Sequence, residues 1–139
     1  LDITGPITVE CWLKPSIDYP STPPEWRGLL TKGYSNEESY GLSYACWTGE
    51  LHFAIRDGGN RYAAITRMEL KSGIWYHIAG TYDGDTIRLF VNGLMVASAT
   101  HHGSIIPNDM PLWIGRGGSG NRSFNGVIDE VRISNKARY

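Results

Sequence analysis

The sequence lacks the features that mark membrane and nucleic-acid-binding proteins. No apolar stretch approaches the ~20 residues that a membrane-spanning helix needs. Thirteen basic residues balance fourteen acidic ones, for a net charge of −1. No basic run or arm stands out that could neutralise a phosphate backbone. We therefore expect neither membrane insertion nor a nucleic acid partner.

Catalytic signatures are also missing. No serine or cysteine lies in a nucleophile elbow, and no Cys or Glu spacing joins the adjacent His101 and His102 into a metal site. Residues 115–120 match the dinucleotide-binding pattern G-x-G-x-x-G. That motif requires a helix to begin at the loop, whereas a further strand pattern follows here. The sequence thus gives no sign of an enzyme.

Cysteine is scarce, with Cys11 and Cys46 as the two copies. Their spacing matches no metal motif. They can pair in an oxidising compartment or remain buried free thiols that act as small hydrophobic side chains. Strand alternation puts each among apolar neighbours, which favours the free thiols but leaves both alternatives open.

Glycine and aromatic residues are plentiful, and residues 74–94 show how they are used. Two runs rich in β-branched and aromatic residues, 74–82 and 86–91, flank Asp83-Gly84, and Asn92-Gly93 leads into 94–99. Asp-Gly and Asn-Gly suit a type I′ hairpin turn because both central residues need positive φ. The stretch predicts three antiparallel strands in a meander.

The rest of the chain repeats this pattern of short strands and turns. In residues 7–15 every second side chain is apolar, as expected of a strand with one face on the core. No segment shows sustained helical periodicity, and 139 residues suffice for one domain. This pattern is typical of a two-sheet sandwich. The predicted strands are 7–15, 28–32, 40–47, 50–57, 61–67, 74–82, 86–91, 94–99, 111–116 and 123–134.

The hairpin formed by 40–47 and 50–57 has a register that depends on its turn. A two-residue turn at Thr48-Gly49 would pair Cys46 with Leu51. The same register pairs Tyr44 with Phe53. A slip by one residue would exchange the two faces of the hairpin.

Five ordered blocks carry a resemblance to a known family. They are Ile7-Thr-Val-Glu-Cys-Trp-Leu-Lys-Pro15, Trp75-Tyr-His-Ile-Ala-Gly-Thr-Tyr-Asp83, Leu89-Phe-Val-Asn-Gly93, Trp113-Ile-Gly-Arg116 and Phe124-Asn-Gly-Val-Ile-Asp-Glu-Val-Arg-Ile133. Together they resemble the laminin G-like domains of the concanavalin A-like lectin/glucanase superfamily. The resemblance implies an all-β jelly-roll sandwich of two curved antiparallel sheets. It also implies a secreted or cell-surface setting in a larger protein with flanking domains, where such modules bind carbohydrate or extracellular proteins.

The chain departs from the family in three ways. Related domains begin one strand earlier. We therefore expect residues 1–139 to be a single laminin G-like domain excised from a larger secreted protein and lacking the usual first strand. The sheet edge where that strand would lie is then open or is filled by another segment. Pentraxins bond a cysteine of the first block to one in the second, where this chain has Ala79 and Gly80, so that disulfide cannot form. The glucanase carboxylate motif Glu-x-Asp-x-x-Glu is reduced to Asp129-Glu130, and catalysis of that kind is not expected.

Calcium is the one cofactor that the resemblance suggests. Related domains often hold a calcium ion through Asp residues at loop ends, and Asp129 is the best candidate ligand here, since calcium takes carboxylate and carbonyl oxygens. The alternative is that Asp129 bonds nearby backbone amides and that Asp83 serves its turn.

Aromatic residues supply the candidate ligand site. A sugar ring can stack its C–H face on an aromatic ring while polar side chains bond its hydroxyls. We expect Trp12, Trp75 and Trp113, which lie in dense strand blocks, to be core residues. The candidates for carbohydrate binding are aromatic and polar residues of loops and hairpins: Trp26, Tyr34, Trp47, Arg56, Tyr62, Arg116 and Asn121. The predicted function is a non-catalytic, lectin-like binding module, and the alternative is a structural or protein-interaction domain without a sugar site.

Overall fold

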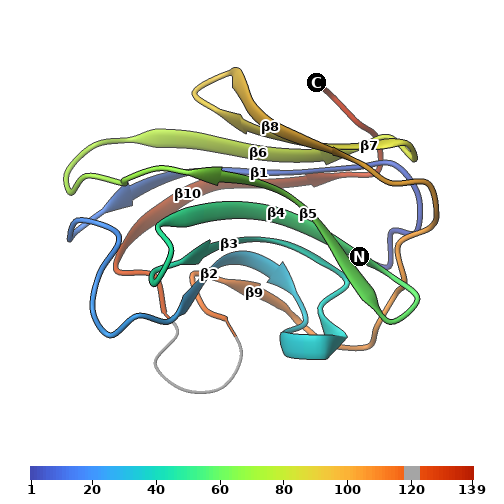
Figure 1. Cartoon of the computed structure of the whole chain (residues 1–139), viewed down its shortest axis with the longest axis horizontal. Helices are drawn as coiled ribbons and strands as arrows, with labels where there is room; N and C mark the ends of the chain where they lie inside the picture. Colours follow the sequence, from blue (N-terminus) through green and yellow to red (C-terminus); the bar gives the residue numbers. More distant parts are fainter. Residues whose placement is uncertain (118–122) are drawn as a thin grey trace.

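The fold is a sandwich of two antiparallel sheets, as predicted from the sequence (Figure 1). A computed structural model describes residues 1–117 and 123–139. The described residues contain ten strands and one short 3₁₀ helix, η1. Their bounds are β1 Ile7–Pro15, β2 Trp26–Lys32, η1 Ser35–Glu37, β3 Tyr40–Ala45, β4 Glu50–Asp57, β5 Asn60–Arg67, β6 Tyr76–Tyr82, β7 Thr86–Val91, β8 Leu94–Thr100, β9 Leu112–Ile114 and β10 Gly126–Ser134.

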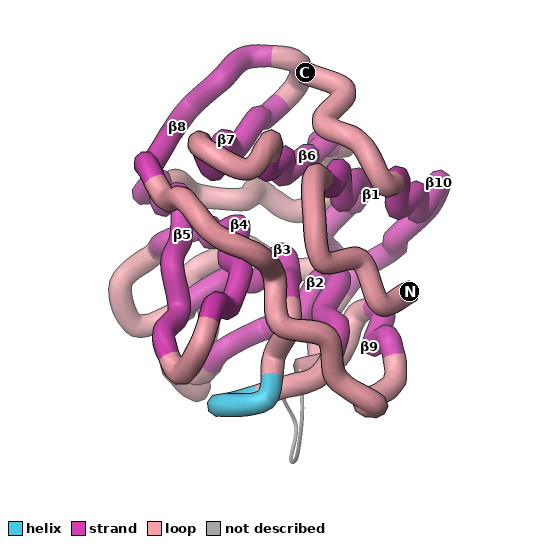
Figure 2. Tube along the Cα trace, turned by 90° about the vertical axis from the view of Figure 1, so that its right-hand side faces the viewer, coloured by secondary structure: helices cyan, strands magenta, loops and turns pink. Residues whose placement is uncertain are grey.

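Each sheet has five strands. The first sheet has the order β10-β1-β6-β7-β8, and the second has the order β5-β4-β3-β2-β9. Figure 2 shows the two sheets as stacked layers, with the segment after β8 crossing from the first layer to the second. The core lies between them and contains the inward-facing residues of β1, all fully buried: Ile7, Val9, Cys11 and Leu13.

The meander β6-β7-β8 turns at both predicted dipeptides. Asn92-Gly93 forms the predicted two-residue turn, whereas the connection at Asp83-Gly84 takes three residues, 83–85. Asn92 and Gly93 have φ values of 51° and 80°, as the tight turn requires. In the preceding turn, Oδ1 of Asp83 accepts the N–H groups of Asp85 and Thr86 at 2.9 and 2.8 Å. The side chain of Asp83 therefore replaces backbone partners that the chain reversal leaves unpaired.

The outer face of β1 is covered in part by the C-terminal residues. The hydroxyl of Thr8 donates to the carbonyl oxygen of Lys136 at 2.7 Å and accepts the N–H of Arg138 at 2.9 Å. The phenol of Tyr139 bonds the Glu10 carboxylate. Thr8 and Glu10 are buried as a result, although strand alternation points them away from the core.

The predicted register of the β3–β4 hairpin is wrong by two residues. Tyr44 pairs with Leu51 and Leu42 with Phe53, because the turn takes four residues, 46–49, instead of two. The N–H of Gly49 closes it by donating to the carbonyl oxygen of Ala45 at 2.9 Å. A shift of two preserves the side-chain alternation, so the predicted core face is retained.

Both cysteines are free and buried, which settles the alternative left open by the sequence. Cys11 faces the core from β1, and its neighbour on β6 is Ile78. Cys46 lies in the β3–β4 turn, with its Sγ 3.7 Å from the hydroxyl oxygen of Ser21.

Candidate functional site

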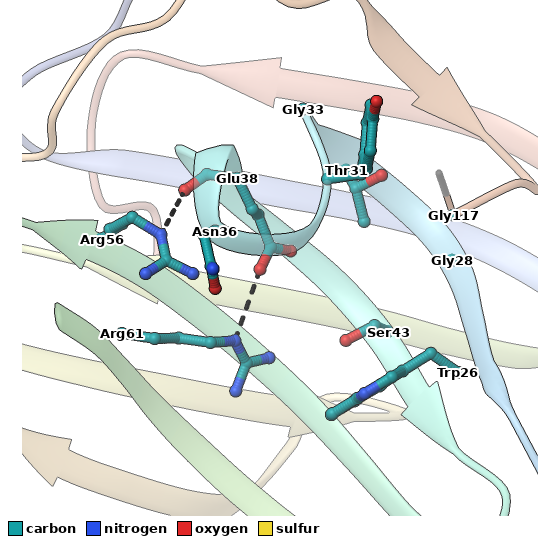
Figure 3. A pocket seen from close by; sticks show the side chains of 11 residues that line it. Trp26, Gly28, Thr31, Gly33, Asn36, Glu38, Ser43, Arg56, Arg61 and Gly117 are labelled. Atoms are coloured by element: carbon teal, nitrogen blue, oxygen red, sulfur yellow. Dashed lines mark hydrogen bonds and ion pairs between the residues drawn. The ribbon is translucent and has the colours of Figure 1, made fainter. Parts of the chain in front are cut away.

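A hollow of about 360 Å³ opens on the outer face of the second sheet (Figure 3). This volume lies at the low end of the ~300–1,000 Å³ found for small-molecule sites. Strands β2 to β5 form its floor, and the segment that contains η1 forms one wall. We call it the sheet hollow, and its lining residues are Trp26, Gly28, Thr31, Gly33, Tyr34, Asn36, Glu38, Ser43, Arg56, Arg61 and Gly117.

Gly28 allows a second segment to reach this face. The backbone of Arg116 passes so close that a Cβ at position 28 would lie 2.5 Å from its carbonyl oxygen. Gly28 also forms a parallel bridge with Ser123. The absence of a side chain at Gly28 therefore lets Gly117 join the rim of the hollow.

Two arginines and one carboxylate form the polar end of the sheet hollow. Nε of Arg61 in β5 lies 3.3 Å from Oε2 of Glu38, and Nε of Arg56 in β4 donates to the Glu38 carbonyl oxygen at 3.1 Å (Figure 3). Burial raises the pKa of the Glu38 carboxyl, while the charge of Arg61 opposes that shift. The pairing Arg56↔Arg61 across the β4–β5 hairpin places both guanidinium groups on the same face.

Trp26 forms the aromatic end. Its ring makes edge-on contacts with Trp47 and His52, at centroid distances of 5.0 and 4.8 Å. The guanidinium carbon of Arg61 lies 5.3 Å from the Trp26 ring centroid. Burial, together with the charge of Arg61, lowers the pKa of His52 to about 4. A neutral His52 thus supports Trp26 at neutral pH, and the indole is held from three sides.

Thr31 of β2 also lines the sheet hollow. Thr31 is 4% exposed, and its Oγ1 has no hydrogen-bond partner among the residues that the structure describes. A buried hydroxyl without a partner is costly, because it has given up its hydrogen bonds to water without replacing them. Ser43 of β3 also lines the sheet hollow.

The structure brings some of the sequence-predicted site residues together and separates others. Trp26, Tyr34 and Arg56 line the sheet hollow, and Trp47, 51% exposed, contacts Trp26 at its border. Tyr62 lies on the opposite face of β5, where its ring stacks on His101 at 3.8 Å.

Arg116 does not line the sheet hollow. Arg116 is exposed, with its guanidinium carbon 5.0 Å from the ring centroid of Trp113. Asn121 lies outside the described residues.

Three residues that line the hollow, Arg61, Glu38 and Thr31, were not among the residues predicted from the sequence. The sequence contained a signal for Arg61. In the β4–β5 hairpin Arg61 lies opposite Arg56, so the two side chains share one face of the sheet, whereas Tyr62 pairs with the core residue Ile55. Glu38 had no such signal, because its position depends on how the segment around η1 folds over β2. Thr31 had none because the register of β2 shifts between Gly28 and Leu30, which interrupts the side-chain alternation.

The expectation that Trp12 and Trp75 are core residues is wrong. They are 38% and 41% exposed, while Trp113 is partly buried. Trp12 lies at an even position of β1, so alternation directs it outward even though the surrounding sequence is apolar. Trp12 and Trp75 line a second cavity of about 320 Å³ together with Asp129 and Glu130. We call this cavity the indole cleft.

Among the residues that the structure describes, Asp129 joins no group of side chains arranged to hold a metal ion. Its Oδ1 accepts the N–H of Glu130 at 2.8 Å. Within residues 1–117 and 123–139, no group of three or more His, Cys, Asp or Glu side chains is arranged to hold a metal ion. A calcium site at Asp129 therefore stays a prediction. No helix in the described part of the chain is long and apolar enough to cross a membrane.

Comparison with known families agrees with this architecture. A laminin G family model, described as the concanavalin A-like lectin/glucanases superfamily, matches residues 1–139. The chain belongs to this superfamily. A search of curated proteins found no match.

Solved structures show the same fold in proteins of low sequence identity. Domains LG4-5 of the mouse laminin alpha1 chain align over 100% of this chain and 39% of theirs, with 19% identity and a TM-score of 0.72. A second structure is domain 4 of AbnA, an extracellular GH43 arabinanase from Geobacillus stearothermophilus, in complex with arabinotriose. It aligns over 96% of this chain and 62% of its own, with 20% identity and a TM-score of 0.73. A third structure is the CBM40 of a Ruminococcus gnavus IT-sialidase, bound to alpha2,3 sialyllactose. It aligns over 99% of this chain and 80% of its own, with 15% identity and a TM-score of 0.72.

Proposed function

We propose that the protein is a non-catalytic, extracellular carbohydrate-binding module and that the sheet hollow is its sugar site. The observation that carries the proposal is the convergence in one hollow of an immobilised indole, two guanidinium groups and an unpartnered hydroxyl, from Trp26, Arg56, Arg61 and Thr31. A sugar ring needs this combination of a flat apolar surface and several fixed hydrogen-bonding groups.

Rigidity supports the same proposal. Trp26 is held by Trp47 and His52, and Arg61 is held by Glu38, so little side-chain freedom is lost when a ligand binds. The folds of an arabinanase domain and a sialidase binding module, both solved with oligosaccharides, are compatible with a sugar site in this chain.

A binding role fits the hollow better than hydrolysis does. Glycoside hydrolysis ordinarily uses two carboxyl groups on opposite sides of the bond to be cleaved. Among the described residues that line the sheet hollow, Glu38 is the one carboxylate, and it is paired with Arg61. We expect a bound oligosaccharide to be recovered intact after prolonged incubation, as measured by chromatography.

The experiment is a glycan array followed by calorimetric titration of the best ligand, with arabinotriose and alpha2,3-sialyllactose as initial soluble probes. Thr31→Val removes the unpartnered hydroxyl with little change in shape. We expect this variant to bind at least fivefold more weakly while being as stable as the parent or slightly more stable, because a buried hydroxyl without a partner is lost.

Thr81→Val is the matched control. Thr81 is fully buried in β6 and its Oγ1 also lacks a partner among the described residues, but it does not line the hollow. Its substitution should leave sugar affinity unchanged. Absence of glycan binding, or an equal affinity loss in both variants, contradicts the proposed site.

A protein-interaction role is the second candidate, and one surface favours it. At the tip of the β7–β8 hairpin, Leu94, Met95 and Val96 are 72%, 58% and 40% exposed. Contiguous apolar side chains on a surface mark interaction sites more often than isolated ones do. Analytical ultracentrifugation should detect concentration-dependent association that Leu94→Glu abolishes; a monomer at all concentrations would count against self-association through this tip.

A further inference from the structure

The indole cleft lies on the first sheet, apart from the proposed sugar site. Trp12 of β1 pairs with Asp129 of β10 on one side and with His77 of β6 on the other. Trp75, which precedes β6, and Glu130 complete the lining. Two tryptophans and two acidic residues thus line an open depression of about 320 Å³.

A β-bulge brings both carboxylates to the cleft. Consecutive residues of a regular strand point to opposite faces. Here the register shifts between Glu10 and Trp12, so that Cys11 of β1 opposes two residues of β10, Glu130 and Val131. Glu130 has a φ of 50°, a conformation that a non-glycine residue seldom adopts. The bulge redirects this side chain, and Glu130 lines the same cavity as Asp129.

The charge of the cleft is negative. No ion pair between described residues includes Asp129 or Glu130, whereas nearby Arg132 pairs with Glu10 at 3.6 Å. The ammonium group of Lys14 lies 5.1 Å from the ring centroid of Trp75, so one indole of the cleft already holds a cation near its ring. The ring of Trp12 contacts His77 at a centroid distance of 5.2 Å. Among the described residues, no lysine or arginine lies over the Trp12 ring or forms an ion pair with Asp129 or Glu130.

We propose that the indole cleft binds the alkylammonium group of a small organic cation. Aromatic faces attract a cation through their quadrupole and also shelter its alkyl groups, and carboxylates at the rim supply the opposite charge. A neutral ligand would gain only the apolar contact. A hard metal ion such as calcium takes six to eight oxygen ligands, of which the cleft lining supplies two carboxylates.

The test follows the indole N–H signals of the five tryptophans by NMR while tetramethylammonium chloride is added. We expect the Trp12 and Trp75 signals to shift with saturation, and the Trp26 signal to stay in place. The neutral molecule of similar size, tert-butanol, should bind at least tenfold more weakly. Sodium chloride controls for ionic strength, and calcium chloride tests the competing metal site.

Variants locate the interaction. Asp129→Asn and Glu130→Asn each remove one charge, and asparagine tolerates the positive φ at position 130. Each should weaken tetramethylammonium binding at least threefold. Asp109→Asn, at an exposed carboxylate of another loop, should have no effect. All three should keep the sugar affinity of the parent, so a failure here is distinct from a failure of the sheet hollow.

Three results would overturn the proposal. They are a lack of saturable shifts at Trp12 and Trp75, equal binding of tert-butanol and tetramethylammonium, and shifts at these residues with calcium but not with tetramethylammonium. The first result would show that the cleft does not bind an alkylammonium group. The second would show that it binds ligands through apolar contact alone, and the third that Asp129 and Glu130 bind a metal ion.

Discussion

The ring of Phe53 in β4 lies directly against the backbone of Gly80 in β6. A Cβ at position 80 would collide with three atoms of that ring. One aromatic side chain of the second sheet therefore fills the space that a residue of the first leaves empty. Gly80 has no positive φ to explain it, so its role is to make room.

Substitution of Gly80 by alanine should overpack this contact. We expect Gly80→Ala to lower the free energy of unfolding by about 1–3 kcal/mol. Adding Phe53→Leu should recover part of the loss, because the smaller side chain removes the collision. Urea denaturation of the single and double variants measures this coupling. Gly5→Ala, where an added Cβ meets nothing within 4 Å, is the control. Additive effects of the two core substitutions would show that Phe53 does not determine the need for glycine.

The pair of Arg61 and Glu38 should matter more for stability than a surface ion pair. Their side chains are 26% and 12% exposed. Arg61→Met leaves a largely buried carboxylate without its partner, and we expect a loss of about 2 kcal/mol. Glu38→Gln in the same chain should restore much of it. Arg67→Met is the matched control, since Arg67 is 74% exposed in its pair with Glu50 and should contribute less than ~0.5 kcal/mol.

His52 should make stability depend on pH. Burial, and then the charge of Arg61, lowers the pKa of His52 from 6.5 to about 4 in the folded protein. Between these pH values the unfolded chain binds the extra proton and the folded chain does not, so stability should fall as pH decreases from about 6.5 to 4. The contribution is at most about 1.4 kcal/mol per pH unit.

The difference between the parent and His52→Gln isolates this effect from the titration of carboxylates. Urea midpoints measured from pH 7 to pH 4 should converge for the two proteins as the pH falls. Parallel curves would mean that His52 takes up a proton equally easily in the folded and unfolded states.

Local chemistry was sufficient to predict most of the strands. Asp83-Gly84 and Asn92-Gly93 mark both turns of the meander, although the first connection takes three residues, 83–85, and the alternation of 7–15 sets the core face of β1. These features depend on neighbours in sequence. The β3–β4 register depended instead on the length of the turn. The predicted two-residue turn at Thr48-Gly49 was too short, because the dipeptide does not reveal that residues 46 and 47 also belong to the turn.

The candidate site was only partly predictable for a different reason. Trp26 and Arg56 were identified by residue type. Side-chain alternation along β5 would have replaced Tyr62 with Arg61 in the predicted site, because Arg61 shares the face of Arg56. Glu38 reaches the hollow only because the η1 segment folds over the sheet, a contact between loop and sheet that no periodicity encodes. For Trp12, overall hydrophobicity of its segment was given more weight than alternation, and alternation was the better guide.

The two thiols should be unreactive in the folded protein. Burial, and to a lesser extent the charge of Glu10, raises the pKa of Cys11 to about 12, so almost no thiolate forms at pH 8. Cys46 is 5% exposed. We expect intact-mass analysis to find no alkylation by iodoacetamide in the native protein and two adducts in urea without reductant. Ser104→Cys, at an exposed position, should add one rapid native adduct. If the protein in urea is labelled only after reductant is added, Cys11 and Cys46 are instead oxidised.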